Sequence, residues 1–331
     1  MADNFIWVVG QCGFEKAIKD AASKHHPQLT AAFQRPGFVS FKSPTPVRPD
    51  FVFCSPLARA FAVSLGRVAP DVTAVREQAE RIGVARYHVF SRDDFEPDES
   101  PGPEPLFAPA RAVEAQLGVG ETVAVVGEHL LDVCLVEPNE WWLGHHVHTL
   151  AHSPFAGGRP RLALPKDAPS RAYLKAEEAI HWAGLPLAPG QTALELGSAP
   201  GGAVWALLQR GLHVVGVDPG DMAAQALAHE RYRHVTCAVA EVPDEAWPRH
   251  CDWLFVDLNL APIKSLHAIE RALPFIKRHL RGMVVTFKIH GGQQIAEVER
   301  YQRRLASFGF SKVAVRQLGF NRRELCVVAQ R

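Results

Sequence analysis

One stretch, residues 193–221, constrains the fold of this 331-residue chain more than any other. An apolar run over residues 192–196 breaks into a loop of small residues, Gly197-Ser198-Ala199-Pro200-Gly201-Gly202. Residues 203–210 then have helical character, and a second apolar run over residues 213–217 ends on Asp218. Strand, glycine loop, helix, strand and acid in this order are typical of the first half of a nucleotide-binding, doubly wound sheet. We therefore predict a Rossmann-like α/β fold for this part of the chain.

The glycine loop also indicates the kind of ligand. Glycine has no side chain to collide with a ligand, so this loop predicts a close approach of backbone to a bound molecule. Its spacing, G-x-x-x-G-G, differs from the G-x-G-x-x-G of dehydrogenases and lacks the Lys-Ser/Thr pair of a P-loop. Glu195, two residues before the first glycine, is instead typical of S-adenosylmethionine enzymes, and Asp218 suits ribose hydroxyls. Another nucleotide site, or glycines that serve packing alone, are the alternatives.

Composition bounds the class of protein. The chain is 47% hydrophobic and 21% charged, as in ordinary globular proteins, and no apolar run reaches the ~18 residues of a membrane span. Six cysteines are scattered without a C-x-x-C pair, which favours reduced thiols. The N-terminus carries an acid where a signal peptide needs positive charge, so we expect a cytoplasmic location and no membrane partner. The sequence gives no indication of oligomeric state.

The net charge of +1 conceals an asymmetry along the chain. Residues 1–150 carry 13 Lys and Arg against 19 Asp and Glu, whereas residues 151–331 carry 23 against 16. A polyanionic partner is therefore expected at the C-terminal half. An uneven scatter of solvated surface charge is the alternative.

Residues 1–150 are predicted to form an N-terminal α+β domain. We expect strands at 5–9, 38–41, 51–53, 87–90, 123–126 and 130–136, and helices at 13–24, 57–68, 72–82 and 110–117. Residues 91–107, acidic and rich in proline, are predicted to be a solvated loop. His145, His146, His148 and His152 are expected to lie exposed near a strand end. We predict no metal, because no acid or cysteine joins these histidines at ligand spacing.

Residues 151–170 are predicted to be an extended basic linker, rich in proline. Its basic residues and the one that follows it, Arg159, Arg161, Lys166 and Arg171, are candidates for holding phosphates. Ser170 suits a helix cap, so a helix is expected from Arg171 to about residue 183. Residues 171–331 then form the second domain. Further strands are expected at 235–239, 253–257, 283–289, 312–318 and 325–329, with helices at 263–280 and 294–307.

Four ionisable residues stand at places where a structural role is uncommon. Asp257 ends a predicted strand, at the edge of the sheet where ligands bind. Lys288 lies inside an apolar strand, where burying an unpaired charge is costly. Glu324 precedes the last strand, and Lys175 lies on the helix that opens the domain. The alternative is that these are surface charges, a turn cap and a lysine that reaches solvent.

This Lys-Asp-Lys-Glu set resembles the tetrad of the FtsJ/RrmJ family of ribose 2′-O-methyltransferases, in the same order and in the same structural places. Within that family the chain is most similar to the RlmM group, which methylates a cytidine of large-subunit (23S) ribosomal RNA. The resemblance is carried by His152-Ser153-Pro154-Phe155, Pro160-Arg161-Leu162, Asp167-Ala168-Pro169-Ser170-Arg171, Leu174-Lys175, Glu177-Glu178-Ala179, Gly197, Pro200-Gly201-Gly202, Val217-Asp218, Gly220 and Met222. It is strong over residues 152–329 and weaker over residues 1–150.

The resemblance implies S-adenosyl-L-methionine as cofactor and RNA as substrate, with no metal required. Lys175, Asp257, Lys288 and Glu324 would be catalytic, and the N-terminal domain would be a ferredoxin-like, THUMP-like RNA-binding region. The cofactor would lie against Glu195, Gly197, Ser198, Pro200, Gly201, Gly202, Asp218, Glu241 and Asp257. Lys288 is the candidate base, with His290 as its rival. Two other functions stay open: a non-catalytic RNA-binding or ribosome-assembly factor, and a small-molecule O-methyltransferase.

Overall fold

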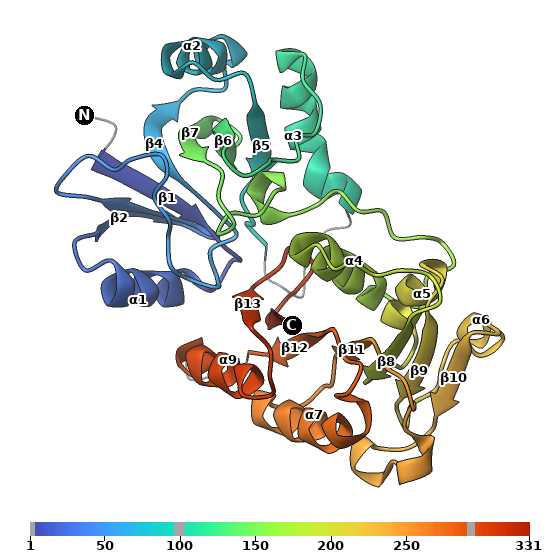
Figure 1. Ribbon diagram of the computed structural model, residues 1–331. Coiled ribbons are helices and arrows are strands. Elements are labelled where there is room, and N and C mark those ends of the chain that lie inside the picture. Colours follow the sequence, from blue (N-terminus) through green and yellow to red (C-terminus); the bar gives the residue numbers. More distant parts are fainter. Residues whose placement is uncertain (1–3, 96–102, 290–294) are drawn as a thin grey trace. The chain divides into compact units, whose positions relative to one another are not determined.

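The computed structural model describes residues 4–95, 103–289 and 295–331. The chain divides into two compact units, residues 1–161 and 162–331. Each unit has its own sheet and its own apolar core (Figure 1). The division falls inside the segment predicted as a linker, residues 151–170, whose first half therefore belongs to the N-terminal unit. Within the described residues, no helix has the length and apolarity needed to cross a membrane.

The N-terminal unit is built on a seven-stranded sheet with the order β2-β3-β1-β4-β7-β6-β5. Its elements are β1 (Phe5–Val9), α1 (Glu15–His25), β2 (Thr30–Arg35), β3 (Phe38–Lys42), β4 (Ala60–Val68), α2 (Val72–Ile82), β5 (Tyr87–Ser91), α3 (Pro103–Leu117), β6 (His129–Glu137), β7 (Glu140–Val147) and the 3-10 turn η3 (Ala156–Gly158). Neighbouring strands pair antiparallel except β5 and β6, which run parallel. The unit thus has the α+β architecture that we expected.

Side chains of β5 and β6 alternate between two buried faces. On one face, Val89 and Leu131 pack in a cluster with Val75 of α2 and Val113 of α3. On the opposite face, Phe90 and Cys134 pack with Trp7 of β1, Trp142 of β7 and Ala156 of η3. Because both faces are covered, polar side chains on these strands are withdrawn from water.

Several predictions for this unit were wrong. Residues 123–126, expected to form a strand, contain only an isolated bridge from Val123 to Phe155. Residues 57–68 were expected to form a helix, but they supply the central strand β4, and residues 51–53 form a loop. Consecutive residues of β4, Phe61, Ala62 and Val63, are all buried. A strand covered on both faces has a continuous apolar run, which periodicity does not separate from a buried helix. The predicted loop over residues 91–107 also ends earlier, since α3 begins at Pro103.

The histidine prediction also needs correction. His146, His148 and His152 are buried, with 3%, 4% and 5% of their surface exposed. His146 lies on β7, a strand that the sequence did not suggest, and the chain after β7 turns back over the same face of the sheet. The imidazoles are therefore part of the interior.

The C-terminal unit has a second seven-stranded sheet, in the order β10-β9-β8-β11-β12-β14-β13. Its elements are α4 (Ala172–Ala183), β8 (Thr192–Leu196), α5 (Gly202–Gln209), β9 (His213–Val217), α6 (Ala224–Leu227), β10 (Tyr232–Val235), η4 (Val239–Glu241), η5 (Asp244–Ala246), β11 (Trp253–Val256), α7 (Pro262–Ile276), β12 (Gly282–Lys288), α9 (Val298–Ala306), β13 (Lys312–Arg316) and β14 (Glu324–Gln330). The first five strands are parallel, and β14 lies antiparallel between β12 and β13. This confirms the predicted Rossmann-like sheet.

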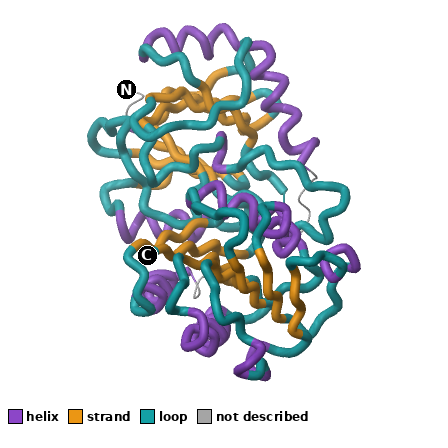
Figure 2. The backbone as a smooth tube through the Cα atoms, turned by 45° about the vertical axis from the view of Figure 1, so that its right-hand side comes forward, coloured by secondary structure: helices purple, strands orange, loops and turns teal. Residues whose placement is uncertain are grey.

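Helices cover both faces of this sheet, with α4 and α5 on one side and α7 and α9 on the other (Figures 1 and 2). Alternate residues of β8 supply the two cores: Ala193 packs with Val204 and Leu207 of α5, whereas Leu194 packs on the side of α7. The carboxyl ends of the parallel strands therefore meet at one edge, between the two helical layers. The strand expected at residues 235–239 lies three residues earlier, as β10.

Candidate active site

The four predicted catalytic residues come from four separate elements of the C-terminal unit. Lys175 lies on the first turn of α4, and Asp257 directly follows β11. Lys288 is the last residue of β12 and Glu324 the first residue of β14, and these two are paired across the antiparallel ladder. The topology therefore brings residues separated by up to 149 positions to the same edge of the sheet.

Their charged groups form one closed network. The Lys175 Nζ atom lies 3.3 Å from Asp257 Oδ2 and 2.7 Å from Glu324 Oε1. The Lys288 Nζ atom lies 3.1 Å from Asp257 Oδ1 and 2.5 Å from Glu324 Oε1. Each ammonium thus donates to both carboxylates, and two positive charges balance two negative ones. The four side chains are only 9–21% exposed, so the network is largely shielded from water.

The network sets the protonation of its members. Burial lowers the pKa of Lys288, but Asp257 and Glu324 act in the opposite direction and raise its pKa above the usual value overall. Burial raises the pKa of Glu324, yet Lys175 and Lys288 outweigh it and lower that pKa overall. At neutral pH Lys288 is therefore an ammonium and Glu324 a carboxylate. His290, the rival base, lies outside the described residues.

Two residues that sequence reasoning missed hold this network in place. The Asn321 amide nitrogen donates to Glu324 Oε2 at 3.3 Å. The Glu178 carboxylate, 1% exposed, accepts hydrogen bonds from the Gly319 and Phe320 amides, both at 2.7 Å. Helix α4 thus carries Lys175 and, one turn later, the residue that fixes the loop before Glu324. An acid on the inner face of an amphipathic helix was the available signal, because such an acid needs a buried partner.

The predicted cofactor loop connects β8 to α5 at the same edge. Glu195 on β8 is 2% exposed, and its Oε2 atom has no hydrogen-bond donor within the described residues. Burial, followed by the charges of Asp257 and Asp218, raises the pKa of Glu195 well above the usual value. A buried carboxylate oxygen without a donor suits a cationic ligand group. Glu195, Lys175, Asp257 and Asn321 line one small cavity, so Glu195 shares this cavity with two members of the tetrad.

Asp218 holds the loop itself. Its carboxylate accepts hydrogen bonds from the Ala199 amide at 3.1 Å and the Gly220 amide at 2.7 Å. An ionised carboxylate has about four acceptor sites, so Asp218 retains capacity for ligand hydroxyls. Ser198 is buried beside Met222, with Oγ 3.7 Å from its sulfur, and Glu241 is exposed at the end of η4.

The glycines are required for a reason that the sequence did not reveal. Gly197 has a φ of +88°, and a Cβ atom there would lie 2.5 Å from the Asp257 carbonyl oxygen. At Gly202 a Cβ would lie 2.3 Å from the Ser170 Oγ atom. These glycines therefore permit the close approach of two protein segments, β11 and the start of α4. Close approach of the backbone to a ligand, which we expected at Gly197, Gly201 and Gly202, stays a prediction.

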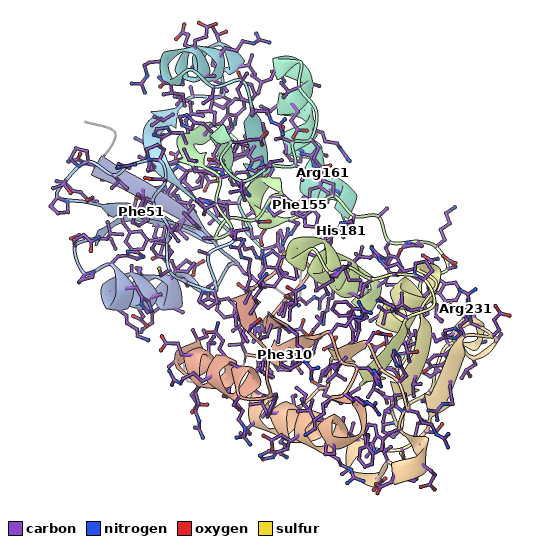
Figure 3. All side chains as sticks on the ribbon, in the orientation of Figure 1. Phe51, Phe155, Arg161, His181, Arg231 and Phe310 are labelled. Carbon is purple, nitrogen blue, oxygen red and sulfur yellow. The ribbon has the colours of Figure 1, made fainter. Side chains whose placement is uncertain are left out.

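The predicted phosphate-binding residues separate into two pairs. Arg159 pairs with Asp93 in the N-terminal unit. Arg161 makes two hydrogen bonds to Glu114 of α3, at 2.6 and 2.7 Å, and Figure 3 labels it beside that helix. Carboxylates already engage both guanidinium groups, so neither belongs in a proposed RNA surface. Lys166 and Arg171 are exposed on the segment that leads into α4.

Part of the chain is similar to known methyltransferases. Residues 168–318 match the family profile described as FtsJ-like methyltransferase. Two curated relatives carry the name "Ribosomal RNA large subunit methyltransferase M". The protein from Alkalilimnicola ehrlichii is 41% identical over a stretch that covers 36% of this chain and 32% of the relative. The protein from Azotobacter vinelandii is 36% identical over 51% of this chain and 49% of the relative. The matching stretches span at most about half the length of these relatives. Among solved structures, TrmN from Thermus thermophilus aligns over 99% of both chains at 14% identity, with a TM-score of 0.38.

Proposed function

We propose, on the premise that residues 168–318 form an FtsJ-like methyltransferase domain, that this chain methylates the 2′-hydroxyl of a ribose in RNA with S-adenosylmethionine as methyl donor. One observation carries the proposal. Lys175, Asp257, Lys288 and Glu324, far apart in sequence, form a single charge network at the ligand-binding edge of the sheet.

The donor set beside the glycine loop fits the cofactor. S-adenosylmethionine supplies a methyl group on a sulfonium centre and carries an amino group and a ribose. Glu195, buried and without a donor on Oε2, is suited to a cationic part of this ligand. Asp218 has acceptor capacity left for the ribose hydroxyls, and Glu241 is the acid available for the adenine side.

Lys288 is the group that we assign to the attacking hydroxyl. A ribose hydroxyl is a weak acid, and its oxygen must be aligned with the methyl group and relieved of its proton. Because the two carboxylates keep Lys288 charged, it first loses a proton to solvent and then accepts the proton of the hydroxyl. Lys175 balances the charge of Asp257 and Glu324, which orient the Lys288 ammonium group.

The substrate is proposed to be large-subunit ribosomal RNA, with a cytidine as the target nucleotide. The names of the curated relatives and the basic balance of residues 151–331 support ribosomal RNA as the substrate, whereas the cytidine is proposed from the family resemblance alone. Lys166 and Arg171 are exposed next to the helix that carries Lys175, so they are the cations proposed to hold RNA phosphates. We propose that the N-terminal unit, THUMP-like in role, helps to select the RNA, and that the protein acts in the cytoplasm.

The test is methyl transfer from labelled S-adenosylmethionine to ribosomal RNA that lacks the modification. Wild type is compared with Lys288→Ala, the product is located by 2′-O-methyl mapping, and Lys264→Ala on α7 is the control. We expect label on one ribose with wild type and Lys264→Ala, and none with Lys288→Ala, although this variant still binds cofactor. Tight cofactor binding without transfer, to free or particle-bound RNA, would instead indicate a binding or assembly factor. Transfer to small hydroxyl compounds alone would indicate a small-molecule enzyme.

A further inference from the structure

The N-terminal unit contains a buried polar cluster that the proposed methyl transfer does not use. Its members are His88, Asp132, His146, His148 and His152, each with 5% or less of its surface exposed. Burying this much polar surface costs free energy unless the groups satisfy one another or a ligand. The cluster lies on the face of the sheet that also buries Phe90 and Cys134, because Phe90 is two residues from His88 and Cys134 two from Asp132.

Strand register brings three members of this cluster together. His88 of β5 and Asp132 of β6 are direct neighbours in the parallel pair. His146 of β7 lies opposite Leu130, two residues from Asp132, and therefore projects from the same face of the sheet. The fold thus supplies what the local sequence around the histidines lacks, an acid at ligand distance.

The three side chains are close enough to hold one metal ion once the hydrogen bond between His146 and Asp132 opens. The His146 Nδ1 atom lies 2.5 Å from Asp132 Oδ2, and the His88 Nδ1 atom lies 3.7 Å from Asp132 Oδ1. One donor atom from each of the three lies within 4.8 Å of the others. Ligand atoms around a tetrahedral Zn²⁺ ion, with bonds of about 2.1 Å, are separated by about 3.4 Å. The centroids of the His88 and His146 rings lie 5.8 Å apart, so the two imidazoles are neighbours.

The charges also favour a cation. The Asp132 carboxylate is 2% exposed, and the side chains close to it include the imidazoles of His88 and His146. Neutral imidazoles are metal ligands, and a divalent ion would supply the positive charge that a buried carboxylate requires.

We propose that His88, Asp132 and His146 bind one divalent transition-metal ion of the Zn²⁺ class in the N-terminal unit. Two imidazoles and a carboxylate are a donor set that Zn²⁺ accepts. The ion takes the place of the proton between His146 and Asp132 and links the three adjacent strands β5, β6 and β7. The histidines after β7, His148 and His152, pack against His146 and enclose the site. This metal stabilises the unit and takes no part in methyl transfer.

The experiment uses the full chain, stripped with a chelator and then given Zn²⁺ or Co²⁺. We expect uptake of about one Zn²⁺ per chain and a visible Co²⁺ spectrum of low coordination number. At a Zn²⁺ concentration a hundredfold above Kd, the melting temperature of the N-terminal unit should rise by roughly 5–10 °C. His88→Gln and Asp132→Asn should each weaken Zn²⁺ binding by at least about 100-fold.

His148→Gln and His145→Gln are the matched controls, the first a neighbour in the cluster and the second a half-buried histidine of β7 next to His129. Both should keep the metal. Circular dichroism of the stripped proteins shows whether a variant has folded. Failure of stripped wild type to take up Zn²⁺ or to gain thermal stability would overturn the proposal. Loss of the metal in His148→Gln but not in His88→Gln would overturn it as well, because a different triad would then hold the ion.

Discussion

Replacing Glu324 by Gln tests how the charge network controls Lys288. The Glu324 carboxylate is shared by the two ammonium groups, at 2.7 Å from Lys175 and 2.5 Å from Lys288. Its removal leaves Asp257 as the single carboxylate against two lysines. Glutamine keeps the size of the side chain and a hydrogen-bond acceptor, so the change acts mainly on charge.

The expected magnitude follows from the geometry. An opposite charge at this distance shifts a pKa by about 1–3 units, and Glu324 is one of two carboxylates that raise the pKa of Lys288. In Glu324→Gln the pKa of Lys288 should therefore fall by about 1–3 units. This corresponds to about 1.4–4 kcal/mol in the free energy of deprotonating Lys288. A larger fraction of Lys288 is then neutral at any given pH below its pKa. The folded unit should lose about 3 kcal/mol, since a mostly buried ion-pair partner is removed.

The assay is single-turnover methyl transfer across the pH range, at saturating cofactor. If Lys288 must lose its proton, the wild-type rate should rise about tenfold per pH unit towards alkaline pH. In the plot of rate against pH, the rising limb of Glu324→Gln should be displaced to lower pH by the same 1–3 units, even if its maximal rate is lower. Glu270→Gln, at an exposed pair with Arg304, is the control and should leave the profile unchanged. A rate independent of pH, or an undisplaced limb in Glu324→Gln, would refute the assignment of Lys288 as proton acceptor.

Three further measurements address other parts of the C-terminal unit. The pKa of Glu195 is raised and a cationic ligand favours its ionised form, so cofactor binding should release protons. Calorimetry in buffers of different ionisation enthalpy should show this release in wild type but not in Glu195→Gln. Gly202→Ala places a methyl group against Ser170 and should destabilise the unit by about 1–3 kcal/mol, whereas Gly120→Ala, with open space around it, should not change the melting temperature. Folding lowers the pKa of Glu324, so its contribution to stability is present above about pH 4.5 and is lost as the pH falls further. Acid should therefore lower the melting temperature of Glu324→Gln by less than it lowers that of wild type.

The C-terminal fold could be predicted because its strands are short apolar runs, and two of these runs are followed by an aspartate. Asp218 and Asp257 each follow a strand, and parallel strands bring such ends to one edge. The positions of the four charged residues therefore marked them as candidates, and the resemblance to the FtsJ/RrmJ family suggested that they form a tetrad. Strand β10 was displaced by three residues because it lies at the edge of the sheet, where the exposed Arg233 removes the apolar signal.

What could not be predicted depends on contacts between distant residues. Glu178 accepts hydrogen bonds from amides that lie 141 and 142 positions later in the chain, and no local sequence pattern links these residues. The same holds for the histidines, whose acidic neighbour Asp132 comes from an adjacent strand. In β4, burial on both faces removed the alternation on which a strand prediction depends.

Helix α4 fixes three features along one side. Ser170, at its start, contacts Gly202 of the cofactor loop, Lys175 reaches Glu324, and Glu178 holds the loop before β14. Each residue added to a helix turns everything beyond it by about 100°. A single-residue insertion between Ser170 and Lys175 would therefore leave the loop contact in place while turning both the lysine and the acid away from their partners. The length of this segment is therefore not free to vary.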